Sequence, residues 1–307
     1  MHHPEAVVAG RKHGAGETFS FAVAGIGISV CNQGGAIRRE PRRQAFEAPI
    51  VNPDIKLRVC SRKLRAEPSG TLVFDSEMVW RLYDDGDERV FRFTSPKSSG
   101  HPYKELRVGR DYREGEIALN EPWQGRELPD PLEYPLDELL VVHRLGQGLG
   151  CELHSCGIVD ADGLGWLFVG HSGAGKSTLA RLWAGREVSV LSDDRIVLRE
   201  IDGVIRMFGT PWHGEAGFAV ATSAPLAGIV VIEHGNSNRI NDLNGISAVS
   251  ELMARSFVPY HEAEALETAI DVLGVAAERV PCCRFRFRPD ATAVDVLSTW
   301  MKAVADA

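Results

Sequence analysis

The glycine-rich segment Gly170–Ser177 carries the most specific chemical pattern in this sequence. It matches the phosphate-loop pattern G-x-x-x-x-G-K-[S/T] at every defined position. Glycines allow a tight turn whose backbone N–H groups point inward, and a helix that begins directly after the loop adds partial positive charge. The pattern therefore predicts a binding site for the phosphates of ATP or another nucleoside triphosphate. The predicted contacts come from Gly170, His171, Ser172, Gly173, Ala174, Gly175, Lys176, Ser177 and Thr178.

Two side chains of this loop have specific expected tasks. The ammonium group of Lys176 is expected to reach the β- and γ-phosphates, and the hydroxyl group of Ser177 is expected to coordinate Mg²⁺. The surrounding sequence fits this prediction, because an apolar strand precedes the loop and a helical segment follows it. The alternative is a glycine-rich turn that binds nothing, and the complete match in this context disfavours it.

Two adjacent carboxylates, Asp193 and Asp194, follow the apolar segment Val188–Leu191, sixteen residues beyond Ser177. A triphosphate site needs a carboxylate for Mg²⁺, usually at the end of a neighbouring strand. With two carboxylates, one can bind the metal while the other orients or deprotonates an incoming hydroxyl group. The pair can share one proton equilibrium, so the sequence alone does not divide the two roles. The alternative is a turn with two solvated aspartates.

Several other polar residues are weaker candidates. His154 lies on the predicted strand that precedes the loop strand, where a lone histidine is more often structural than catalytic. His213 and Glu215 lie in a compact segment that either contacts the acceptor or is a plain turn. Arg239 is either a cation for the transferring phosphoryl group or an exposed loop arginine. The basic run Arg38–Arg43 either attracts an acidic peptide or is simply solvated.

The N-terminal part of the chain predicts two regions. Residues 1–17 are polar and rich in glycine and histidine, which predicts a mobile tail. Residues 18–134 contain short runs of alternating polarity, with a hairpin turn at Asp84–Asp87, and predict an antiparallel β unit. Within this region, Phe19–Cys31 predicts one buried strand. Residues 34–47 carry four arginines and predict an exposed connection.

Residues 135–307 alternate between predicted helices and strands, which predicts an α/β fold. The adjacent cysteines Cys282 and Cys283 are expected to be core residues of a strand. The predicted helices are Leu136–Leu145, Lys176–Trp183, Ser247–Ser256, Ala263–Gly274 and Asp295–Lys302. The predicted strands are Cys151–Val159, Gly165–Val169, Val188–Leu191 and Gly228–Glu233.

Composition and charge exclude several classes of protein. The formal charge of −8 and the pI near 5.7 argue against nucleic acid or an anionic membrane as the main partner. The six cysteines show no C-x-x-C or zinc-binding spacing and predict reduced thiols. The apolar run that begins at Phe19 is too short to span a bilayer, and a signal peptide is the minor alternative for it. A cytoplasmic location is expected.

The arrangement of His154, the loop Gly170–Ser177 and the Ser192-Asp193-Asp194 segment resembles the catalytic domain of HPr kinase/phosphorylase, which is related to the nucleotide-binding part of phosphoenolpyruvate carboxykinase. It looks closest to HPr-kinase-like proteins of about 300 residues, some of which phosphorylate a serine of a precursor peptide, as in lasso-peptide pathways. The resemblance covers about 136–307. It implies that Asp193 is the base, that Asp194 is its metal-associated partner, and that His154 lies near the transferred phosphate.

The sequence shows no counterpart of the later family segment that supports the reverse, phosphorolytic reaction, so HPr is not the expected acceptor. The leading interpretation is a kinase that uses ATP or another nucleoside triphosphate with Mg²⁺ and transfers the γ-phosphoryl group to a hydroxyl group. The acceptor is a serine of a peptide or protein, or a small metabolite. The alternatives are a nucleotide-binding switch without an acceptor and a carboxykinase-like enzyme. A homo-oligomer is compatible with the sequence.

Overall fold

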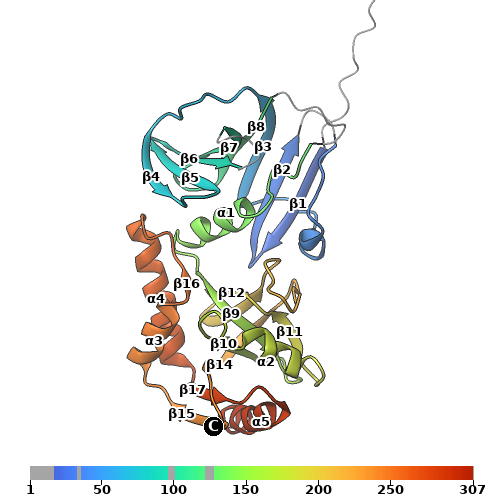
Figure 1. Cartoon of the computed structure of the whole chain (residues 1–307), viewed down its shortest axis with the longest axis vertical. Coiled ribbons are helices and arrows are strands. Elements are labelled where there is room, and N and C mark those ends of the chain that lie inside the picture. Colours follow the sequence, from blue (N-terminus) through green and yellow to red (C-terminus); the bar gives the residue numbers. More distant parts are fainter. Residues whose placement is uncertain (1–16, 33–35, 96–100, 122–127, 307) are drawn as a thin grey trace, which may run out of the picture.

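The computed structural model describes residues 17–32, 36–95, 101–121 and 128–306. These residues form two large β-sheets and five α-helices in a mixed α/β arrangement, with the first sheet at the top of Figure 1 and the second below it. A mobile tail was predicted over residues 1–17. Residues 1–16 lie outside the described residues, and Glu17 begins the first strand. Among the described residues, no helix is both long and apolar enough to cross a membrane.

The first sheet has eight strands in the order β1-β2-β3-β8-β7-β6-β5-β4. Its strands are β1 (Glu17–Val23), β2 (Ile26–Asn32), β3 (Ile55–Arg62), β4 (Thr71–Asp75), β5 (Trp80–Asp85), β6 (Glu88–Thr94), β7 (Pro102–Gly109) and β8 (Glu114–Asn120). The predicted hairpin turn is present between β5 and β6. The sheet is mixed, because β2 pairs with β3 and β3 pairs with β8 in parallel. The prediction of an antiparallel unit was therefore wrong in these two pairings, since residue alternation carries no information on strand direction.

Two local predictions in this region were also wrong. Phe19–Cys31 is an antiparallel hairpin of β1 and β2 instead of one strand. Ala24 (φ 52°) and Gly25 (φ 75°) reverse the chain, and the buried apolar residues on both sides conceal this turn in the sequence. The connection 34–47 is not simply exposed, because its described part contains a 3₁₀ helix, η1 (Pro41–Phe46), with Arg43 buried at 1% exposure.

The second sheet has nine strands, and its long strand β14 (Ser223–His234) has three partners. β14 pairs with β13 at its start, with β10 through its middle and with β17 toward its end. The other strands are β9 (Cys151–Val159), β10 (Gly165–Val169), β11 (Ser189–Ser192), β12 (Arg195–Ile201), β13 (Val204–Gly209), β15 (Arg239–Asp242), β16 (Ser256–Phe257) and β17 (Cys282–Phe287). Because β14 pairs with both β13 and β10, the five strands β10, β9, β12, β13 and β14 form a closed ring of paired strands.

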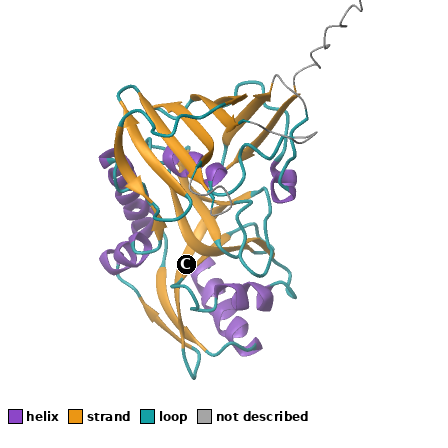
Figure 2. Ribbon diagram, turned by 45° about the horizontal axis from the view of Figure 1, so that its top comes forward, coloured by secondary structure: helices purple, strands orange, loops and turns teal. Residues whose placement is uncertain are grey.

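Helices cover both faces of the second sheet (Figures 1 and 2). α2 (Lys176–Trp183) and α5 (Ala291–Ala305) cover one face, and α3 (Gly245–Met253) and α4 (Ala263–Arg279) cover the other. The strand residues alternate between these two cores: Leu167 and Val169 pack toward α3 and α4, whereas Trp166 and Phe168 pack toward α2 and α5. This period of two is the signature of a strand that is buried on both faces.

α1 (Leu136–Leu145) lies between the two sheets (Figure 1). Its apolar side chains, including Leu136 and Leu140, belong to the same hydrophobic cluster as the inner face of the first sheet. Val197 of β12 and Trp212, which follows β13, belong to this cluster too. The helix therefore packs the first sheet onto the second.

Candidate functional site

The glycine-rich loop connects β10, which ends at Val169, to α2, which begins at Lys176. Gly173 (φ +79°) and Gly175 (φ +101°) adopt backbone conformations that side chains with a Cβ disfavour. At Gly175 there is also no space, because a Cβ would lie 2.8 Å from Cζ of Phe287. The loop therefore turns tightly into the helix N-terminus, as the sequence pattern predicts for a phosphate-binding loop.

Lys176 lies across this loop with its ammonium group turned back onto the backbone. Its Nζ donates to the carbonyl oxygens of Gly170 (2.9 Å) and His171 (3.1 Å), and the side chain is nearly buried. Burial lowers the pKa of Lys176 to about 8, although the nearby carboxylate of Asp194 acts in the opposite direction. An anion at the loop would replace these carbonyl contacts and raise the pKa of Lys176 again, because a nearby negative charge favours the charged form.

Asp193 is fully buried and accepts four hydrogen bonds. The hydroxyl group of Ser177 donates to Oδ2 at 3.0 Å, which connects the end of β11 to the first turn of α2. The other donors are backbone N–H groups of the segment that follows β13: Gly214 at 3.0 Å, Ala216 at 2.9 Å and Phe218 at 3.3 Å. With its lone pairs occupied in this way, Asp193 holds the 214–218 segment and Ser177 in place.

Asp194 is less buried, and its carboxylate lies between two cationic or potentially cationic side chains. Nε2 of His154 lies 3.0 Å from Oδ1, and the guanidinium group of Arg195 contacts Oδ2. Burial alone would raise the pKa of Asp194, but the hydrogen bond from His154 and the charges of Arg195 and Lys176 outweigh it and hold the pKa below its usual value. Arg195 and His154 are adjacent because they are directly paired in the β12–β9 ladder.

A polar cavity of about 330 Å³ brings these groups together. The loop and α2 contribute Ser172, Gly173, Gly175, Lys176, Ser177 and Thr178 to its lining. The rest of the lining is His154, Arg181, Asp194, Gly214, Glu215 and His234. Six residue positions predicted from the loop pattern therefore line one cavity with His154, Asp194 and Glu215, while Gly170, His171 and Ala174 contribute loop backbone.

Two weaker candidates do not line this cavity. The ring of His213 is exposed and contacts the carbonyl oxygen of Gly214 at 3.0 Å. Arg239 is exposed at the start of β15, where it pairs across the ladder with Arg286. Both positions match the plainer alternatives that the sequence left open, a structural turn and an exposed arginine.

Three residues at the site were missed by the sequence reasoning. His234, the last residue of β14, contacts the carbonyl oxygen of Gly173 at 2.5 Å, and Arg181 lies one turn into α2. Arg195 directly follows the acidic pair, and its Nε donates to Oε1 of Glu138 at 2.7 Å. The sequence indicated Arg195 only through its place next to the acidic pair. An exposed arginine can occupy such a place as well as a site residue can.

A network of carboxylates surrounds Arg195. Besides Asp194 and Glu138, Oε1 of Glu152 lies 3.5 Å from its Nε. Glu152 is fully buried, and among the described residues neither of its oxygens has a hydrogen-bond partner within normal geometry. Burial, together with the neighbouring carboxylate of Glu138, raises its pKa well above the usual value. Arg195 also lies over the ring of Phe257, with Cζ 4.1 Å from the centroid. The guanidinium group is thus fixed from several sides.

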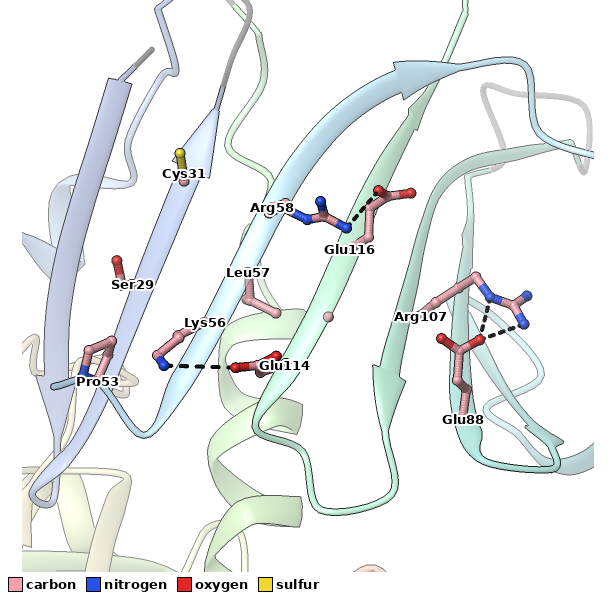
Figure 3. Close-up of a pocket in the computed structure, with 11 residues that line it drawn as sticks. Ser29, Cys31, Pro53, Lys56, Leu57, Arg58, Glu88, Arg107, Glu114 and Glu116 are labelled. Atoms are coloured by element: carbon pink, nitrogen blue, oxygen red, sulfur yellow. Dashed lines mark hydrogen bonds and ion pairs between the residues drawn. The ribbon is translucent and has the colours of Figure 1, made fainter.

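A larger cavity, of about 660 Å³, lies on the outer face of the first sheet (Figure 3). Its charged side chains form cross-strand ion pairs, in which Lys56 lies 3.7 Å from Glu114 and Arg107 lies 2.8 Å from Glu88. No residue predicted to act in catalysis or phosphate binding lines this cavity. The residues predicted to act instead line the smaller cavity at the glycine-rich loop.

Comparisons with known proteins find matches among the solved structures. The structure of the HPr(Ser) kinase/phosphatase from Coxiella burnetii matches with 11% sequence identity and a TM-score of 0.31, over 51% of this chain and 99% of that chain. Neither a protein-family model nor a curated protein matches the chain.

Proposed function

We propose that this protein is an ATP-dependent phosphotransferase that moves the γ-phosphoryl group to a hydroxyl acceptor. The observation that carries this proposal is the position of Asp194, whose carboxylate lines the same cavity as Lys176 and Ser177. A loop that only bound nucleotide would not require a second carboxylate at this position, held by His154 and Arg195. On the same grounds we propose a P-loop core of the HPr kinase and phosphoenolpyruvate carboxykinase type.

The residues present fit a triphosphate. The ammonium group of Lys176 donates to two loop carbonyl oxygens, so one of its three N–H donors is left for a phosphate oxygen, and the other two become available when those contacts are exchanged. Arg181 adds a second cation to the cavity, and the start of α2 directs backbone N–H groups toward it.

The oxygen ligands present also fit Mg²⁺. Within the described ranges, no cluster of three or more His, Cys, Asp or Glu side chains is arranged to bind a metal by itself. Mg²⁺ typically keeps several waters and binds through one or two carboxylates and the phosphates of the substrate. We propose that the hydroxyl group of Ser177 holds it together with the phosphates, and that the carboxylate of Asp193, which accepts from Ser177 at 3.0 Å, orients that hydroxyl group.

The geometry supports a division of roles opposite to the one implied by the family resemblance, which made Asp193 the base. Asp193 is enclosed by four donors, whereas Asp194 reaches the cavity. We therefore assign proton acceptance to Asp194. It takes the proton of the acceptor hydroxyl group as that oxygen bonds to the γ-phosphorus. The bond to the bridging oxygen then breaks, and its electron pair leaves with the nucleoside diphosphate.

Lys176 and His154 complete the proposed machinery. Lys176 stabilises the charge on the β- and γ-phosphate oxygens, and His154 orients Asp194 through the 3.0 Å contact between Nε2 and Oδ1. The proposed acceptor is a serine of a peptide or protein, because the cavity is open to a chain approaching from the surface next to Gly214 and Glu215. A small metabolite with a hydroxyl group is the other acceptor to test.

The decisive experiment follows the label of γ-labelled ATP in the presence of Mg²⁺, with a peptide fraction and a metabolite fraction supplied separately. We expect transfer that falls at least about 100-fold in Asp194→Asn, because general-base catalysis contributes a factor of that order. Binding of a nucleotide analogue should persist in Asp194→Asn and be lost in Lys176→Ala. Asp162→Asn, at an exposed position in the β9–β10 turn, is the matched control. Nucleotide binding without any transfer would contradict the kinase and favour a nucleotide-dependent switch.

A further inference from the structure

An apolar cavity of about 370 Å³ lies beside the candidate phosphoryl-transfer site. Phe74 and Trp80 of the first sheet stack at its rim, with ring centroids 4.8 Å apart. Leu139 and Val142 of α1 form one wall, and the segment from Phe257 to His261 forms the other. The cavity therefore lies where the first sheet, α1 and the segment before α4 meet.

One wall of this cavity is shared with the candidate site. The ring of Phe257 lies under the guanidinium group of Arg195 at 4.1 Å and beside the ring of His154, 6.3 Å between centroids. Glu138 lines the cavity and accepts the hydrogen bond from Arg195. Arg195 in turn contacts Asp194, so the apolar cavity and the proposed base are on opposite sides of the same arginine.

The cavity offers almost no charge to a ligand. Among its twelve lining residues none is a lysine or arginine, and its single carboxylate, Glu138, is already paired with Arg195. His143 donates from Nδ1 to the carbonyl oxygen of Leu139 at 2.7 Å, and burial lowers its pKa to about 4, so its ring is neutral at pH 7. An uncharged, largely apolar group complements this lining.

We propose that the cavity binds a large apolar side chain, aromatic or branched aliphatic, from the same polypeptide that carries the phosphorylated serine. This inference rests on the proposed function and names the class of its acceptor. Arg195 contacts both the cavity wall, at Phe257, and the proposed base Asp194. Because the cavity is so close to the proposed base, a side chain of the acceptor is favoured over a separate ligand. A second copy of this chain fits poorly, since a stable interface uses about 20–30 residues on each side, and only twelve line this cavity.

The spacing between the apolar residue and the serine follows from the geometry. Phe257 is one ring contact away from Arg195 and His154, both of which contact Asp194. An extended chain advances about 3.3 Å per residue, so the wall and the carboxylate, with one guanidinium group between them, are separated by roughly two to three residues of acceptor. A side chain at that separation can occupy the cavity while the hydroxyl group reaches Asp194.

The test uses short fluorescent peptides with one central serine in an alanine background and one phenylalanine at each flanking position in turn. Binding is measured by anisotropy with ADP and Mg²⁺ present, and transfer is measured with γ-labelled ATP. We expect the best phenylalanine position to bind about tenfold tighter than the all-alanine peptide, as burial of one aromatic ring implies. Leucine and tryptophan at that position should retain the effect, whereas aspartate should abolish it.

Variants assign the effect to the cavity. Tyr260→Glu and Phe74→Glu place charges at its rim, where the two side chains are 63% and 41% exposed, and each should remove the phenylalanine preference. Ile246→Glu, at a position 88% exposed on α3, is the matched control and should keep it. Tyr260→Ala provides a milder variant that should weaken the preference without adding charge.

Each outcome separates this inference from the proposed function. A phenylalanine preference in binding without phosphoryl transfer supports the cavity and contradicts the kinase. Transfer that is indifferent to phenylalanine supports the kinase and overturns the cavity proposal. A preference that persists in both glutamate variants overturns it as well, and so does a complete lack of peptide binding.

Discussion

The hydroxyl group of Ser177 lies 3.0 Å from Oδ2 of Asp193, although sixteen residues separate the two in the sequence. The contact joins the first turn of α2 to the end of β11. Because Asp193 also accepts three backbone hydrogen bonds from the 214–218 segment, one carboxylate determines the positions of three parts of the site. Removing it should disturb the fold as well as the chemistry.

Asp193→Ala is predicted to destabilise the protein even without nucleotide. The substitution leaves three partly buried N–H groups without this acceptor, and hydrogen bonds to charged groups contribute about 1.5–3 kcal/mol each. We expect the free energy of unfolding to fall by about 3–5 kcal/mol, measured by urea denaturation. Asp194→Asn should cost clearly less, because Asp194 is partly exposed and keeps most of its contacts. Equal losses in the two variants would contradict the structural role assigned to Asp193.

Two glycines of the loop form a matched pair. Gly173→Ala meets no atom within 4 Å and should cost only the left-handed backbone penalty of about 1–2 kcal/mol. Gly175→Ala brings a Cβ to 2.8 Å from the buried ring of Phe287 and should cost about 1–3 kcal/mol more. Thermal denaturation without ligand measures both. If Gly175→Ala were no less stable than Gly173→Ala, the close packing of the loop on Phe287 would be refuted.

Arg43 is predicted to be essential for stability. It is 1% exposed, contacts the carboxylates of Asp130 and Asp137, and donates to the carbonyl oxygen of Leu132 at 2.8 Å. Arg43→Met leaves those carboxylates buried with fewer partners and should lower the free energy of unfolding by about 3–5 kcal/mol. Arg38→Ala, at an exposed position of the same basic run, should change it by less than about 0.5 kcal/mol.

Stability is predicted to depend on pH through His143. Burial lowers its pKa to about 4 from the usual 6.5, so between these values the unfolded chain binds a proton that the folded chain does not. The folded state is therefore destabilised as the pH falls from about 6.5 to about 4, by up to roughly 3 kcal/mol at 1.36 kcal/mol per pH unit. The half-buried His261 faces it at 3.3 Å, with Arg89 and Glu262 nearby, and its lowered pKa acts in the same direction.

Urea denaturation at pH 7 and pH 4.5 tests this prediction. The loss of stability between the two pH values should be smaller in His143→Gln than in the unmodified protein, by about 2–3 kcal/mol. His213→Gln, which changes an exposed histidine, should leave the pH dependence as it is. An unchanged pH dependence in His143→Gln would show that His143 is protonated in the folded state.

The elements next to the glycine-rich loop were predicted with their full bounds because local signals agree there. Cys151–Val159, Gly165–Val169 and Lys176–Trp183 combine apolar runs or helical periodicity with the glycines and the aspartate turn that end them. Leu136–Leu145 is a further match, and Gly146 follows it directly. Cys282 and Cys283 are buried in β17, as expected.

Elements that depend on tertiary contacts were predicted less well. β12 and β13 were missed because Arg195, Arg199 and Glu200 interrupt the apolar pattern, and each of these charges has a partner that is distant in the sequence. The Asp202-Gly203 turn between them, with φ values of 51° and 78°, was the usable signal. α4 and α5 extend beyond their predicted ends, because packing on the sheet prolongs helices whose outer turns have weak periodicity.

The site shows the same contrast. The loop pattern and the acidic pair are each a contiguous stretch of sequence, so both could be recognised from their residue types alone. The partnership of His154, Asp194 and Arg195 comes from the β9–β12 pairing, which brings together residues about 40 positions apart, and no local pattern encodes such a register. The apolar cavity beside Phe257 was not foreseen for the same reason, since its walls come from four separate elements.

The position of α1 has a consequence for how the protein unfolds. Its side chains complete the core of the first sheet, and that core also includes Val197 and Trp212 of the other half. Neither half can be excised without exposing a contiguous apolar surface to water. Heating should therefore produce one calorimetric transition for the whole molecule, and a fragment that starts at Leu136 should aggregate on expression.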